Sequence, residues 1–226
     1  PRSIPKLIHR MTHDAGVPTD SLEWHGHNDF HKVHINGATA WLYGCDALNV
    51  TLFGIGERTG NPPLEGAVFE YIAIKGDLCG LDPTVLTEIA AYYEAEIGTK
   101  IPDNYPFVGR HFNTTRAGIH ADGLYRDERI YNIFDTAKLL GRPPGVAITD
   151  KSGADGVMLW VNQFLGLEGD ERLNKIKLVK ICRYVADQYD AGRTTAISEE
   201  ELIDQLRLHL PPDLYDDRVK PRLGLS

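Results

Sequence analysis

The chain has 226 residues, with 24 Lys plus Arg against 32 Asp plus Glu, so its formal net charge is −8 with His neutral. This acidic balance argues against a surface that binds nucleic acid or an anionic membrane, because both reward clustered positive charge. Apolar residues make up 42% and charged residues 25%, which is typical of a globular chain and too hydrophobic for a disordered one. The apolar runs are too short for a membrane span, and the N-terminus lacks the pattern of a signal peptide.

The three cysteines of the chain give information about the redox environment of the protein. Cys45, Cys79 and Cys182 are odd in number, widely spaced and free of any CxxC pair. The pattern therefore disfavours both a disulfide framework and a thiolate zinc site. We expect reduced structural thiols and a cytoplasmic protein.

The chain enters a helical pattern almost at once. Ile4, Leu7, Ile8 and Met11 recur at helical spacing, as if an element were entered just after its loop. Since the first residue is Pro rather than Met, we expect the sequence to be part of a longer protein.

The first 80 residues alternate between strand and helix patterns. The patterns predict, in order, a short buried strand over 22–29, a helix over 31–44, a strand over 46–55 buried on both faces, a glycine-rich loop over 54–61 and a helix over 64–75. This order is typical of a parallel α/β sheet or barrel.

Beyond residue 80 the chain is predicted to be mostly helical. Helices are expected from Pro83 to Gly98, near 126–133, and from the segment 151–156 onward, with a turn at 142–145. The last clear helix begins at Ser198, which forms a capping box with Glu201, and Ile197 and Leu202 are spaced as a hydrophobic staple. We therefore divide the chain into an α/β part over 1–80 and a helical linker and subdomain over 81–226.

The sharpest local feature is the run His25-Gly26-His27-Asn28-Asp29 at the end of a predicted strand. Alternate residues of a strand point the same way, so His25 and His27 can offer two imidazoles to one metal ion. The spacing alone leaves a second interpretation open, in which both histidines are loop residues without a ligand. It also does not choose among zinc, manganese, iron and cobalt.

The next predicted strand ends in the run Gly54-Ile55-Gly56-Glu57-Arg58-Thr59-Gly60-Asn61. It delivers a carboxylate, a guanidinium and an amide to the same end of the sheet, where ligands bind in α/β folds. A dinucleotide site is disfavoured, because neither GxGxxG nor a Walker lysine is present. Mixed imidazole and oxygen ligands indicate a divalent metal that polarises a carbonyl substrate.

Three motifs in order carry a family resemblance: HGHND at 25–29, GIGERTGNPPLE at 54–65, and RAGIHADG at 116–123 followed by Tyr131. Together they resemble the isopropylmalate and homocitrate synthase family, whose members condense acetyl-CoA with a 2-oxo acid on a metal-bearing TIM barrel. The resemblance implies that residues 1–80 hold the last strands and helices of a (β/α)8 barrel, followed by a mostly helical subdomain.

The resemblance also implies roles for eight residues. The metal ligands would be His25, His27 and Asn61, binding a divalent ion whose identity (Mn, Co, Mg or Zn) the sequence does not distinguish. Glu57 would be catalytic, and Arg58 and Asn28 would bind substrate. His120 and Tyr131 resemble the catalytic pair that the helical subdomain offers to the neighbouring subunit, which implies a homodimer with subdomain exchange. Spacing alone favours a structural histidine and a packed helix residue for these two, and only the resemblance favours the catalytic roles.

The residues within the motifs are most similar to those of the Re-type citrate synthases of this family. The similarity lies in GHNDF, the run at 40–45 and the segments at 113–124, 132–136 and 142–145. This likeness implies acetyl-CoA and oxaloacetate as substrates and citrate as product. Homocitrate synthase and 2-isopropylmalate synthase are the alternatives, followed by a lyase or aldolase of the wider barrel superfamily and by a non-enzymatic subunit of a split enzyme. In every enzymatic case we expect a missing N-terminal barrel half, because two strands cannot close an eight-stranded barrel.

Overall fold

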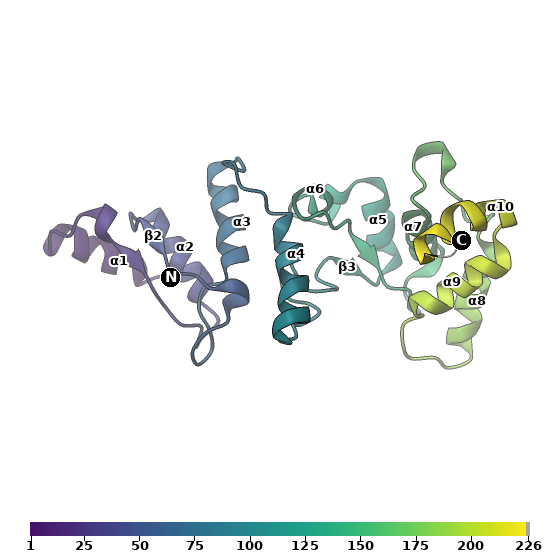
Figure 1. Cartoon of the computed structure of the whole chain (residues 1–226), viewed down its shortest axis with the longest axis horizontal. Coiled ribbons are helices and arrows are strands. Elements are labelled where there is room, and N and C mark those ends of the chain that lie inside the picture. The colour runs from purple at the N-terminus through teal and green to yellow at the C-terminus, as the bar shows by residue number, and fades with distance from the viewer. Residues whose placement is uncertain (225–226) are drawn as a thin grey trace. The chain divides into compact units, whose positions relative to one another are not determined.

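The structure, a computed structural model, describes residues 1–224, and at Tyr125 only the backbone. The chain divides into two compact units, Pro1–Phe112 and a second unit from Asn113 onward (Figure 1). The boundary predicted at residue 80 lies inside the first unit. Within the described range, no helix is both long and apolar enough to cross a membrane.

The first unit alternates strands and helices as the sequence predicts. Its elements are α1 (Ile4–His9), β1 (Glu23–Trp24), α2 (Val33–Leu42), β2 (Ala47–Leu48), α3 (Leu64–Lys75) and α4 (Val85–Tyr92). The strands pair in parallel, with Glu23 opposite Ala47 and Trp24 opposite Leu48. Parallel pairing requires a crossover, and α2 supplies it. The helix-rich α/β class is thereby confirmed for this unit.

The strands are far shorter than predicted. The segment 46–55 was expected to be one strand buried on both faces, but only Ala47–Leu48 pairs, and Ala47 is exposed. Beyond it, Thr51 makes a single parallel bridge to Pro63, and a 3₁₀ turn follows over Leu52–Gly54. A parallel strand is buried on both faces only when neighbouring strands and helices cover it. The two-stranded sheet of this unit does not provide that cover.

The helices of the first unit begin and end where local residues dictate. Helix α3 has the predicted bounds, since it starts after Pro63 and ends at Gly76, whose φ of 68° is the left-handed conformation that glycine favours. Helix α2 starts two residues later than predicted, because His31 has a φ of 52° and lies outside the helix. A small core joins α1 to α2, through Ile4, Ile8, Ala40 and Cys45.

The second unit is built mainly from helices. They are α5 (Gly118–Arg126), α6 (Thr136–Leu140), α7 (Gly153–Leu165), α8 (Val179–Asp190), α9 (Glu199–His209) and α10 (Pro212–Leu214). Two short strands, β3 (Thr114–Thr115) and β4 (Gly145–Val146), pair in parallel. The buried apolar faces of α7, α8 and α9 meet in one core that contains Leu165, Ile181 and Leu206.

Two predictions for this unit have opposite outcomes. The helix expected near 126–133 is wrong: α5 ends at Arg126, because Asp127 is extended and its carboxylate caps a 3₁₀ turn over Glu128–Ile130. The capping box at α9 is confirmed, because the Ser198 hydroxyl accepts from the Glu201 amide and the Glu201 carboxylate accepts from the Ser198 amide.

Candidate functional site

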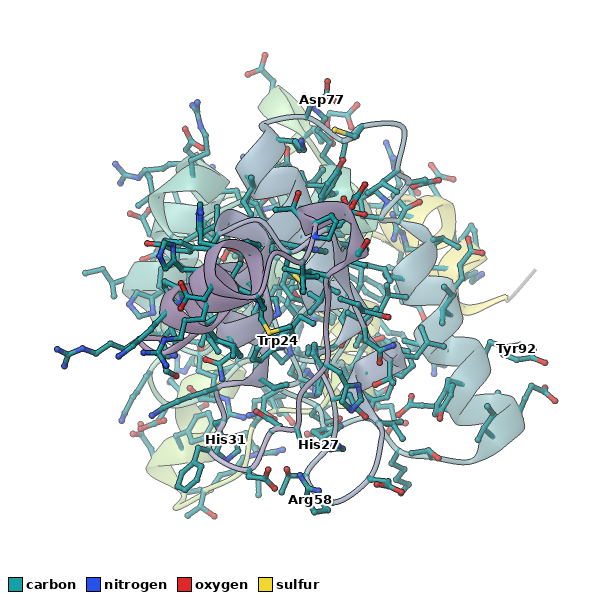
Figure 2. The ribbon with its side chains drawn as sticks, turned by 90° about the vertical axis from the view of Figure 1, so that its left-hand side faces the viewer. Trp24, His27, His31, Arg58, Asp77 and Tyr92 are labelled. Carbon is teal, nitrogen blue, oxygen red and sulfur yellow. The ribbon has the colours of Figure 1, made fainter. Side chains whose placement is uncertain are left out.

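His25 and His27 follow β1 directly, and their imidazoles converge. The two Nε2 atoms lie 3.4 Å apart, and the rings meet edge to face with centroids 5.1 Å apart. Figure 2 shows His27 close to Arg58 at the lower edge of the first unit, where the loop after β1 meets the loop over 54–61. The structure therefore brings together the two imidazoles that the His-x-His spacing predicts.

The other ring nitrogen of each histidine faces an oxygen. His25 Nδ1 is 3.1 Å from Asn49 Oδ1, while the Asn49 amide nitrogen donates to Glu23. His27 Nδ1 is 3.3 Å from the carbonyl oxygen of Glu57. Since both oxygens can only accept, both Nδ1 atoms are the donors. With Nδ1 as the donor of each ring, the two Nε2 atoms remain to face each other, an arrangement typical of metal-binding histidines.

Backbone and side-chain amides join the two loops. The Asn28 amide donates to the Gly60 carbonyl at 3.0 Å, and the buried Asn61 side chain donates through Nδ2 to the Gly26 carbonyl at 2.9 Å. The side-chain oxygen of Asn28 accepts from the Val33 amide at the start of α2. Asn28 and Asn61, predicted as substrate-binding and metal-binding residues, therefore lie beside the histidine pair and hold its loop.

An exposed ion pair crosses between the same loops. Arg58 donates to both carboxylate oxygens of Asp29, at 3.3 and 3.1 Å, and the Thr59 hydroxyl adds a third hydrogen bond. The Arg58 guanidinium holds the pKa of Asp29 below its usual range. Arg58, predicted to bind substrate, is thus oriented by Asp29. The Glu57 side chain is exposed, while its carbonyl orients His27.

These donors fit a divalent metal. The 3.4 Å between the two Nε2 atoms is short enough for one ion to be bound by both imidazoles. Among the residues that the structure describes, no group of three or more His, Cys, Asp or Glu side chains could hold a metal. The two imidazoles alone would therefore fill only part of a coordination sphere.

The second unit brings His120 and Tyr131 together. Their rings stack with centroids 4.5 Å apart and an interplanar angle of 29°. His120 lies on α5 and Tyr131 directly follows the 3₁₀ turn over Glu128–Ile130, so the turn folds the tyrosine back onto the helix. Tyr131 is half exposed. The contact between the two side chains is between ring faces and is not a hydrogen bond.

Sequence reasoning missed Asn49 and Asp29. Because Trp24 pairs with Leu48, Asn49 stands beside His25, so the strand register contained the signal. Asp29 stands in the HGHND run, and only the fold of the 54–61 loop shows that it binds Arg58.

A family model described as HMGL-like matches residues 1–92. A citrate (Re)-synthase of Syntrophus aciditrophicus (strain SB) is 55% identical over 224 residues, which are 97% of this chain and 36% of that protein. A citrate (Re)-synthase of Clostridium kluyveri is 50% identical over 204 residues, 89% of this chain and 45% of that protein. A 2-isopropylmalate synthase of Acetivibrio thermocellus is 33% identical over 181 residues, 78% of this chain and 35% of that protein.

The resemblance predicted from the three motifs is confirmed by these matches. The chain spans between about a third and a half of the length of these curated relatives.

Proposed function

We propose that the chain forms part of a metal-dependent acyltransferase that condenses acetyl-CoA with oxaloacetate to give citrate. Its first 92 residues match the HMGL-like family. The carrying observation is the convergence of His25 Nε2 and His27 Nε2, each ring held by an oxygen at Nδ1. The 55% and 50% identities to two citrate (Re)-synthases support the choice of oxaloacetate.

The first unit would contribute the last strands of a TIM barrel. Each strand of a closed barrel pairs on both sides, whereas β1 and β2 pair only with each other in the described sheet. A barrel portion outside this chain would supply the remaining strands, further metal ligands and much of the 2-oxo acid pocket. The relatives are long enough to hold such a portion.

His25, His27 and Asn61 would hold the divalent ion. When bound, it would supply a Lewis acid that stabilises the negative charge developing on the ketone oxygen of oxaloacetate. Arg58, oriented by Asp29, and Asn28 would meet the substrate carboxylates, and the exposed Glu57 carboxylate would assist proton transfer.

His120 and Tyr131 would act as the base that takes a proton from acetyl-CoA and as its proton-transfer partner. A base removes one proton from the methyl group of acetyl-CoA, the resulting carbanion forms a carbon–carbon bond to the ketone carbon, and the ketone oxygen takes up a proton. Water then cleaves the thioester, which releases citrate and the CoA thiol. In a homodimer with subdomain exchange, this pair would serve the active site of the neighbouring subunit.

The test measures release of the CoA thiol by the chain supplied with its barrel portion. Acetyl-CoA is offered with oxaloacetate, 2-oxoglutarate or 2-oxoisovalerate, and we expect oxaloacetate to be preferred. Preference for either other acid would move the assignment to homocitrate or 2-isopropylmalate synthase. A non-enzymatic subunit is indicated if no acid supports thiol release.

Two double variants are compared, and each of them removes one close pair of imidazoles. His25→Ala/His27→Ala should abolish both Co²⁺ binding and thiol release. His9→Ala/His13→Ala removes another close pair, with ring centroids 4.3 Å apart, and should leave thiol release unchanged. Equal losses in both variants would contradict the proposed metal site.

A further inference from the structure

Glu65 is a buried carboxyl group that the proposed chemistry does not use. It lies in the first turn of α3, and its exposed fraction is 0%. Burial of an ionisable side chain is costly unless its oxygens are well bonded. Burial raises the pKa of Glu65, and Oε1 has no hydrogen-bond partner among the described residues. Because this burial costs folding free energy, we expect Glu65 to have a specific structural role.

The other oxygen of Glu65 holds a strained turn. Oε2 accepts from the Phe53 amide at 3.1 Å, within the 3₁₀ turn over Leu52–Gly54. Phe53 has φ 55° and ψ 21°, the left-handed conformation that disfavours residues with a side chain. Its ring is buried and packs edge to face on Tyr93, with centroids 5.2 Å apart. The hydrogen bond to Glu65 and the packing on Tyr93 stabilise the left-handed conformation of Phe53, which phenylalanine would otherwise avoid.

The turn fixes the base of the 54–61 loop. Asn61 donates its amide hydrogen to the Gly54 carbonyl at 2.9 Å, and the Thr51 amide donates to Pro62 at 3.0 Å. The Gly60 backbone approaches Gly54 so closely that an added Cβ would collide with the Gly54 carbonyl. The direction in which the loop leaves β2 therefore follows from the conformation at Phe53.

Two further segments of the first unit converge on Glu65. The Tyr105 hydroxyl lies beside Gly54, and burial together with the nearby Glu65 carboxyl raises the pKa of Tyr105. His34 of α2 packs against Gly66, the residue after Glu65. Because α2 begins four residues after the HGHND run, this packing also relates Glu65 to the loop that carries His25 and His27.

We propose that Glu65 is a positioning residue for the candidate metal site: it holds the Leu52–Gly54 turn so that the 54–61 loop presents the Glu57 carbonyl to His27 and the Asn61 amide to Gly26. This inference rests on the proposed function for its metal and on the described hydrogen bonds for its geometry. Glu65 acts through the loop and touches none of the reacting atoms.

The experiment compares two replacements of similar volume. Glu65→Gln keeps an oxygen that accepts from Phe53, whereas Glu65→Met keeps the shape and removes the acceptor. We expect Glu65→Met to weaken Co²⁺ binding at least tenfold, as loss of a support for a metal-binding histidine does, and Glu65→Gln to stay within about threefold of the parent chain. The readout is titration followed by the visible absorption of Co²⁺.

Amide hydrogen exchange gives a second readout that needs no metal. In Glu65→Met the Gly60 and Asn61 amides should exchange at least tenfold faster, while the amides of α9 keep their rates. Glu65→Ala repeats the same loss in case methionine packs badly. Glu70→Ala is the matched control, because Glu70 lies on the same helix and contacts His34 at 3.5 Å rather than the turn, and it should leave exchange at 60 and 61 unchanged.

The two failures are distinguishable. If the parent chain, supplied with its barrel portion, binds no Co²⁺ through His25 and His27, the proposed metal site fails, and the exchange rates still test the loop. If Glu65→Met and Glu65→Ala keep both the Co²⁺ affinity and the exchange rates of the parent chain, Glu65 does not position the loop.

Discussion

The interactions inside the first unit differ from those inside the second. In the second unit, α7, α8 and α9 bury one continuous apolar core. In the first unit, the apolar cluster between α1 and α2 is small, and the loops at 25–29 and 54–61 are joined by hydrogen bonds and the Asp29–Arg58 ion pair. Apolar burial supplies most folding free energy, whereas exposed polar contacts supply little. The core of α7, α8 and α9 therefore stabilises its unit more than the polar contacts between the loops at 25–29 and 54–61 stabilise theirs.

Truncation of one core residue in each unit should expose this difference most strongly. Leu206 on α9 is fully buried, so Leu206→Ala should lower the free energy of unfolding of the second unit by about 3 kcal/mol. Ile8→Ala, in the small cluster of the first unit, should cost less than about 2 kcal/mol, because its surroundings can collapse around the gap. Amide exchange in urea resolves the two units. Equal costs, or loss of protection in both units from Leu206→Ala, would contradict the comparison.

A functional division between the units is tested by His120. His120→Ala should lower kcat for citrate formation about 100-fold, a loss typical of general acid–base catalysis, and leave Co²⁺ affinity unchanged. His25→Ala should instead weaken Co²⁺ binding, and citrate formation should fall together with the bound metal. Tyr131→Phe tests the second member of the pair, because it keeps the ring that stacks on His120 and removes only the hydroxyl; it should lower kcat and leave Co²⁺ affinity unchanged. Steady-state kinetics and Co²⁺ titration measure the two effects, and a weakened Co²⁺ affinity in His120→Ala would refute the division.

The smallest expected effect concerns the cap of α9. Arg193 donates to both oxygens of Glu201, at 2.5 and 2.6 Å, and lowers the pKa of Glu201 to about 2. A carboxyl group with a lowered folded pKa stabilises the fold above its ordinary value of 4.5, and that contribution disappears as the pH falls from 4.5 toward 2. Because Glu201 is a third exposed, screening limits the contribution to about 1 kcal/mol.

Glu201→Gln isolates this contribution, since glutamine keeps the capping box and cannot ionise. Urea unfolding should find the variant less stable than the parent chain at pH 7 and equal to it near pH 2. A difference that stays constant over this pH range would assign the effect to packing rather than to the ion pair.

Local signals in the sequence predicted the helix ends well. Helix α3 lies between Pro63 and Gly76, and α9 begins at the Ser198 capping box, because each signal acts within one turn of the helix. The strand over 46–55 and the helix near 126–133 were wrong for the opposite reason. Burial of a strand depends on partners far away in the sequence, and Asp127 stops α5 by bonding to a turn that composition alone does not mark.

The candidate site shows the same limit. The spacing of His25 and His27 placed two imidazoles on one side of the chain, which the structure confirms. It could not show that Asn49 and the Glu57 carbonyl fix the ring tautomers, because those contacts join residues 24 and 30 positions apart. Glu65 is the last residue of the motif over 54–65, but its burial could not be predicted, since a glutamate in the first turn of a helix is ordinarily exposed.

The glycines of the 54–61 loop have a consequence for how this protein can change. An added Cβ at Gly56 would collide with the Asn61 side chain, and one at Gly60 would collide with Gly54, so these positions admit almost no substitution. The tip residues Glu57, Arg58 and Thr59 are exposed and only touch the opposite loop at their side chains or carbonyl. The loop therefore combines two glycines that cannot change with tip side chains that can, and a change at Arg58 or Thr59 costs only its exposed contact with Asp29.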